Sequence, residues 1–145
     1  RLGGSAGASF QTDDFNGTDT DTTTASFDVG RFFTQSLELG ARVSYASVDA
    51  GAGSVDTSSG MLLGRWYTNG DSATRPWLEL ATGFGKRQAG STNISGFLYS
   101  IALGATQFFN NAVAGEVFVR ETVGSYDGGA ESDALDVGVG LAVFW

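Results

Sequence analysis

The 145-residue chain contains no cysteine and no histidine, and it has a single proline and a single lysine. Without cysteine there is no disulfide, thiolate metal site or cysteine nucleophile. The lack of histidine removes the commonest general base and metal ligand at neutral pH, so most hydrolase and zinc-site hypotheses fail. The formal net charge of −8 argues against nucleic acid as a partner, because nucleic-acid binding requires clustered lysine and arginine. We therefore expect no catalytic residue, no cofactor and no metal site.

Long apolar runs are also missing, so the sequence predicts no membrane-spanning helix. A membrane strand needs only about 9 to 11 alternating residues, and the mean hydropathy of −0.02 is therefore uninformative. The chain does contain 22 glycines and 12% aromatic residues, a composition that favours strands and turns. Its length predicts one domain, residues 1–145. Because Arg1 already lies in a strand pattern, we expect that any signal peptide has been removed.

The clearest strand pattern is the stretch 133–145 (DALDVGVGLAVFW), which alternates with period 2. One face is continuous, bulky and apolar, whereas the other is mostly small and carries one carboxylate, Asp136. This asymmetry is typical of a transmembrane barrel strand whose branched residues face lipid. A soluble sandwich strand with its bulky face inward remains an alternative for this segment alone.

Seven further segments show the same asymmetry, and together they predict an all-β, eight-stranded antiparallel up-and-down transmembrane β-barrel. The predicted strands are residues 2–11, 25–33, 37–48, 60–68, 77–87, 95–109, 112–124 and 133–145. The connections at 12–24, 49–59, 88–94 and 125–132 are predicted to be long loops, and those at 34–36, 69–75 and 110–111 to be shorter turns. Outer-membrane barrels have short periplasmic turns and long outer loops, so we expect both termini on the periplasmic side and the last strand beside residues 2–11.

Aromatic residues gather at the ends of the predicted strands, where an interfacial girdle is expected. They are Phe32, Phe33, Trp66, Tyr67, Trp77, Phe108, Phe109, Phe144 and Trp145.

Two motifs carry a family resemblance: GRFFTQSLELGA at 30–41, a strand, a short polar turn and Leu-Glu-Leu-Gly-Ala, and the terminal LAVFW. With these motifs the whole chain resembles the small eight-stranded outer-membrane barrels of the OmpA, OmpX and OmpW kind. The resemblance implies a bacterial outer-membrane location and no catalysis, since enzymatic barrels of this size rely on a histidine. It also implies that Leu141, Val143 and Trp145 form the signal read by the outer-membrane assembly machinery, although the family usually ends in Phe. No peptidoglycan-binding domain follows, so OmpA-like anchoring is not expected.

The face predicted to line the barrel interior carries eight charged residues: Asp28, Glu38, Arg42, Arg65, Glu79, Glu116, Arg120 and Asp136. The interior of an eight-stranded barrel is just wide enough for side chains to fill. Unpaired charges there cost several kcal/mol each, so we expect a paired network that seals the barrel. The alternative is a narrow ion path lined by Glu38, Glu79 and Glu116.

Acidic residues dominate the predicted outer loops, at Asp13, Asp14, Asp19, Asp21, Asp49, Asp56, Asp127, Glu131 and Asp133. We expect outer-membrane lipid and lipopolysaccharide as partners, and protein partners at the loops or barrel wall are left open, including a larger envelope assembly. Three functions remain: a structural or surface-interaction barrel, a narrow channel for small or apolar solutes, and a soluble lipocalin-like barrel that binds a small ligand. The direction in which the bulky face points distinguishes the last from the first two.

Overall fold

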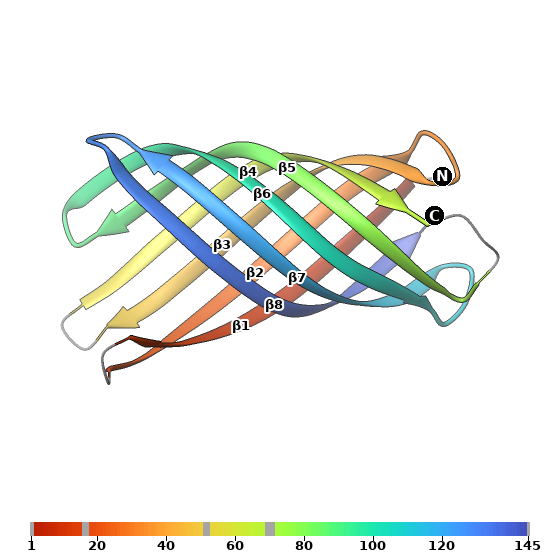
Figure 1. The fold of residues 1–145 in the computed structure, drawn as a ribbon, viewed down its shortest axis with the longest axis horizontal. Coiled ribbons are helices and arrows are strands. Elements are labelled where there is room, and N and C mark those ends of the chain that lie inside the picture. The colour runs from red at the N-terminus through yellow and green to blue at the C-terminus, as the bar shows by residue number, and fades with distance from the viewer. Residues whose placement is uncertain (1, 16–17, 51–52, 69–71, 145) are drawn as a thin grey trace.

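The structure, a computed structural model, describes residues 2–15, 18–50, 53–68 and 72–144, which form eight strands. These are β1 (Leu2–Phe15), β2 (Thr18–Phe32), β3 (Leu37–Ala50), β4 (Gly53–Tyr67), β5 (Thr74–Ala89), β6 (Thr92–Phe108), β7 (Val113–Tyr126) and β8 (Ala130–Phe144). Each strand pairs antiparallel with the next, and β8 returns to β1 to close the barrel (Figure 1). The predicted fold class is confirmed. No helix in these ranges is long and apolar enough to cross a membrane.

Both chain termini lie at one end of the barrel, which we call the terminal end (Figure 1). The turns after β2, β4 and β6 lie there too. The predicted Asn110 turn is confirmed, because its side-chain oxygen accepts hydrogen bonds from the backbone nitrogens of Ala112 and Val113 at 2.8 and 2.9 Å. We call the opposite end, where β5 turns into β6 and β7 into β8, the hairpin end.

The prediction of long loops at the hairpin end is wrong. β1 continues to Phe15 and β2 begins at Thr18, β3 ends at Ala50 and β4 begins at Gly53, and tight turns join β5 to β6 and β7 to β8. These polar segments are rich in Thr and Ser and remain paired with the neighbouring strand. The pairing gives the backbone N–H and C=O groups hydrogen-bond partners without burying apolar area. Gly90, Gly128 and Gly129, with φ of 58°, 84° and 79°, allow the tight tips.

Alternation along the strands points the bulky apolar face outward. On β8, Leu135, Val137 and Leu141 are 56%, 60% and 61% exposed, whereas Ala142 and Phe144 are 1% and 5% exposed. On β4, Leu62 and Trp66 also point outward, as predicted, and Arg65 points inward. We call this outward surface the apolar belt; its members are Phe27, Val29, Leu39, Val43, Tyr45, Leu62, Trp66, Leu78, Leu80, Phe84, Phe97, Tyr99, Ile101, Leu103, Val117, Val119, Leu135, Val137, Val139, Leu141 and Val143. This direction is the opposite of that in a soluble lipocalin-like barrel, so the prediction of outward apolar faces is confirmed.

Beyond the apolar belt, the strands continue toward the hairpin end with polar residues on the outside. This polar collar consists of Ser58, Lys86, Gln88, Asn93, Ser95, Glu121, Ser125, Glu131 and Asp133, all exposed. Glu131, predicted to lie in the loop 125–132, is therefore a strand residue of β8. The polar collar lifts the hairpin tips clear of the apolar belt.

The prediction that the strand-end aromatics all form an outer girdle is also wrong. Phe33, Trp66 and Phe109 are exposed, but Tyr67, Trp77 and Phe144 are buried in the barrel interior. Neighbouring residues of a strand point to opposite faces, so one ring points outward and the other inward in the pairs Phe32–Phe33, Trp66–Tyr67 and Phe108–Phe109. The inward rings form what we call the aromatic plug at the terminal end: Phe32, Tyr67, Trp77, Phe108, Phe118 and Phe144. Trp145 lies outside the described residues.

A second apolar layer lies on the hairpin side of the interior. Met61, Leu63, Ala81, Leu98 and Tyr126 pack together there. Between this layer and the aromatic plug lie the charged residues of the interior.

Candidate functional site

The charged residues reach the interior because each occupies an inward position on its strand. The register also sets opposite charges directly across four strand pairs: Asp28 faces Arg42, Glu38 faces Arg65, Arg65 faces Glu79, and Arg120 faces Asp136. Opposite charges in such cross-strand pairs attract each other. The sheet itself therefore brings together residues that are far apart in the sequence.

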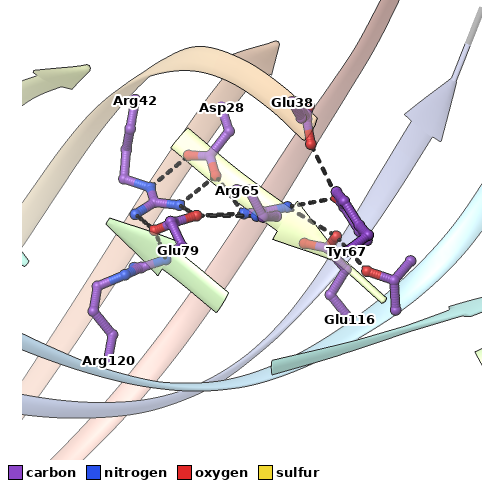
Figure 2. Close-up of polar contacts among 9 residues, drawn as sticks. Asp28, Glu38, Arg42, Arg65, Tyr67, Glu79, Glu116 and Arg120 are labelled. Carbon is purple, nitrogen blue, oxygen red and sulfur yellow. Dashed lines mark hydrogen bonds and ion pairs between the residues drawn. The ribbon is translucent and has the colours of Figure 1, made fainter. Parts of the chain in front are cut away.

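Glu79 is the centre of the network and is completely buried (Figure 2). Its two carboxylate oxygens accept hydrogen bonds from Arg42 Nη1 and Nη2 at 2.6 and 2.9 Å. Arg65 Nε and Nη2 donate to Glu79 Oε2 at 3.0 and 2.7 Å. One carboxylate thus holds two guanidinium groups through charge-assisted hydrogen bonds.

Each of these two arginines also holds a second carboxylate. Arg42 Nε and Nη2 donate to the two oxygens of Asp28 at 2.7 and 2.6 Å, and Arg65 Nη1 donates to Glu116 Oε1 at 3.1 Å. Because the positive and negative groups alternate, the charges of the cluster largely neutralise one another. The desolvation cost of burying them is offset only by such complete pairing.

Three neutral residues that the sequence analysis did not select complete the network. The Tyr67 hydroxyl donates to Glu38 Oε2 at 2.9 Å, and Thr106 Oγ1 donates to Glu116 Oε1 at 2.9 Å. The Arg65 guanidinium lies over the Trp77 ring, 4.3 Å from its centroid. Parity alone places Tyr67 on the same face as Arg65, but nothing in its sequence context indicates a polar role.

Arg120 is bound less completely than the other two arginines. Its Nη2 lies 3.7 Å from Glu79 Oε1, and its guanidinium covers the Phe118 ring at 4.5 Å. Its Nε is buried and has no hydrogen-bond partner within the described part of the chain. Asp136 lies half-buried across the β7–β8 ladder from Arg120. The structure thus joins seven of the eight selected residues in one hydrogen-bonded and ion-paired cluster, with Asp136 beside it.

Two cavities approach this cluster from opposite ends of the barrel. The vestibule, our name for the cavity at the hairpin end, has a volume of about 490 Å³ and includes Arg42, Arg120 and Asp136 in its lining. The cavity at the terminal end, also about 490 Å³, is lined in part by Phe32, Phe108 and Phe144. The charge network and the aromatic plug lie between these two cavities.

The three residues expected to form the assembly signal are placed only in part. Leu141 and Val143 point outward from β8 as members of the apolar belt. Trp145 lies outside the described residues.

No protein-family model and no curated protein matches the chain by sequence. Similar solved structures do exist, and three cover nearly the whole chain. Neisserial surface protein A has a TM-score of 0.77 at 11% identity, covering 99% of this chain and 97% of its own. The outer membrane protein OprG from Pseudomonas aeruginosa has a TM-score of 0.60 at 13% identity, covering 97% and 94% respectively. PagL, described as an outer membrane enzyme, has a TM-score of 0.62 at 19% identity, covering 98% and 99%. The chain therefore has the fold of the small outer-membrane β-barrels.

Proposed function

We propose, starting from this fold, that the chain is a bacterial outer-membrane barrel with a structural or surface-interaction role and a sealed interior. The observation that supports the proposal is the combination of an outward apolar belt with an interior that contains a network of paired charges. On β8 the belt runs from Leu135 to Val143, nine residues, which is the length a tilted strand needs to cross the apolar layer. The charge network makes the barrel rigid rather than reactive.

The polar collar supports an orientation with the hairpin end outside the cell and the terminal end in the periplasm. Charged residues such as Lys86 and Glu121, and hydroxyl-bearing residues such as Ser125, suit contact with water, lipopolysaccharide headgroups and protein partners. In this orientation Leu141 and Val143 lie near the periplasmic end of β8, where the assembly machinery would read them. Whether the partners include other subunits of an envelope assembly is a question for co-purification.

A non-catalytic role fits the state of the interior carboxylates. Glu79 and Asp28 are engaged by arginine, and Glu116 by arginine and threonine, so they are held as ion-pair partners rather than as acids or bases. The chain also lacks histidine altogether. PagL carries the description of an enzyme, but at 19% identity its fold is all that is shared here.

Membrane insertion is tested by extraction and by gel mobility. The folded chain is expected to require detergent and to partition into lipid vesicles. It should also migrate differently in SDS gels before and after boiling, because a closed barrel resists SDS until it is heated. A protein that stays monodisperse in plain buffer would overturn the proposal.

A narrow channel is the second candidate, since the two cavities leave only the network and the plug as barriers. Planar-bilayer recordings separate the two functions. A sealed barrel gives no conductance steps in the wild type, whereas a channel gives steps that change when Glu79 is replaced by Gln. Steps in the wild type would favour the channel.

A further inference from the structure

The vestibule is a built cavity with a distinct chemical character. Its floor carries two guanidinium groups, those of Arg42 and Arg120, and its lining also includes Arg87. Its walls include the apolar side chains of Met61, Leu98 and Tyr126. One carboxylate of inward parity, that of Asp136, also lines the vestibule, whereas the side chains of Glu131 and Asp133 point outward in the polar collar. A volume of about 490 Å³ lies within the range of small-ligand sites.

The two floor arginines differ in what they can still bind. Arg42 already makes four hydrogen bonds to carboxylates, two to Asp28 and two to Glu79. Arg120 is 6% exposed and makes no such bond among the described residues, and its Nε is buried without a partner. A buried guanidinium donor without an acceptor destabilises the fold, because its hydrogen bond to water is lost and no hydrogen bond within the protein replaces it. Figure 2 shows Arg120 at the edge of the network, on the far side of Glu79 from Arg65.

We propose that the vestibule binds a short-chain monocarboxylate, with its carboxylate on Arg120 and its alkyl tail along the apolar wall. Arg120 lines the vestibule and makes no hydrogen bond to a carboxylate among the described residues, so an oxyanion bound there gives its guanidinium group the charged acceptor that Asp28 gives Arg42. Asp136, which faces Arg120 across the β7–β8 ladder, favours a ligand with a single negative charge, since a second charge would meet this carboxylate. The packed side chains of Met61, Leu98 and Tyr126 favour an alkyl tail over a polar one.

This binding site goes beyond the sealed-barrel role and does not depend on it. The network below the vestibule stays closed when the ligand is bound, because Glu79 keeps its four hydrogen bonds from Arg42 and Arg65. The ligand therefore enters and leaves by the hairpin end.

The test uses the full chain folded in detergent micelles and follows the arginine Nε–H resonances by NMR while sodium butyrate is added. The Arg120 resonance is assigned by its loss in Arg120→Gln. We expect a saturable shift of this resonance with butyrate, a weaker response to acetate, and none with butylamine or butanol. Ala134→Leu narrows the vestibule without touching the network. The Kd for butyrate should rise about tenfold or more, because the larger side chain crowds the site and the alkyl tail loses its contact with the apolar wall.

Arg31→Gln is the matched control, because Arg31 is exposed at the terminal end of β2. In this variant the butyrate response of Arg120 should be unchanged. In Arg120→Gln, the backbone amides of Thr122 and Ala134 serve as second reporters, and their butyrate shifts should disappear. The proposal is overturned if the Arg120 shift is not saturable, if Ala134→Leu binds butyrate as the wild type does, or if the amide shifts persist in Arg120→Gln. An equal response to butylamine would also overturn it.

Discussion

Replacing Glu79 by Gln is the sharpest test of the charge network. The two side chains have nearly the same shape, so packing is preserved while the negative charge at the centre is removed. Arg42 and Arg65 then lose the carboxylate that accepts four of their hydrogen bonds. The amide nitrogen of Gln also turns two donor hydrogens toward guanidinium groups that are themselves only donors.

The expected loss is large because the site is dry. Removing one partner of a buried ion pair costs about 3–5 kcal/mol. Glu79 is 0% exposed and serves two arginines, so we expect the upper half of that range. With a urea dependence of about 2 kcal/mol per molar, the unfolding midpoint should fall by about 2 M.

The measurement is reversible urea unfolding in lipid vesicles, followed by tryptophan fluorescence. Glu121→Gln, on the exposed polar collar, is the surface control and should change stability by less than about 0.5 kcal/mol. Arg120→Met is the interior control. Because its ion pair with Glu79 is long, at 3.7 Å, its loss should cost about 1 kcal/mol or less. A Glu79→Gln variant within about 1 kcal/mol of the wild type would refute the view that the network stabilises the barrel.

Three further substitutions test other parts of the structure by the same unfolding assay. A Cβ on Gly83 would clash with the Gly60 carbonyl oxygen, so Gly83→Ala should lower the free energy of unfolding by about 1–3 kcal/mol. A Cβ on Gly60 would meet nothing within 4 Å, so Gly60→Ala is the matched control and should leave the stability unchanged. Leu80→Lys places a charge on the apolar belt and should cost about 2–4 kcal/mol in vesicles, and an unchanged stability would argue that this face does not contact lipid. Phe144→Ala removes a buried ring of the aromatic plug and should cost about 3–5 kcal/mol, while a loss below about 1 kcal/mol would mean that the plug does not close the terminal end.

The interior residues could be selected from sequence because parity is a local property. A residue two positions from Arg65 on the same strand must point to the same side, whatever the rest of the chain does. The choice of side for β4 rested on placing Arg65 inside, and Leu62 and Trp66 do point outward. Which charges meet could not be derived, since Arg65 contacts Glu116 across 51 positions of sequence and the contact depends on the curvature of the closed barrel.

The extent of the strands was missed for a different reason. Polar composition predicts a loop where a segment must bury apolar area to become ordered. In a barrel that projects beyond its apolar belt, the ladder alone orders residues such as Thr57, which pairs with Ala46 and Arg87. Sequence composition therefore marks where the apolar belt ends, not where the strand ends.

By itself, the sequence determined the fold class, the strand count and the inward position of the eight selected charges, because all three follow from a period-2 pattern along each segment. Arg75 and Arg87, which also line the interior cavities, were not selected. Only the tertiary structure decided which carboxylate each arginine binds and which aromatic rings pack at the terminal end. It also decided that Arg120 Nε has no hydrogen-bond acceptor among the described residues. These properties depend on distances across the interior, and such distances exist only once eight tilted strands have closed on one another.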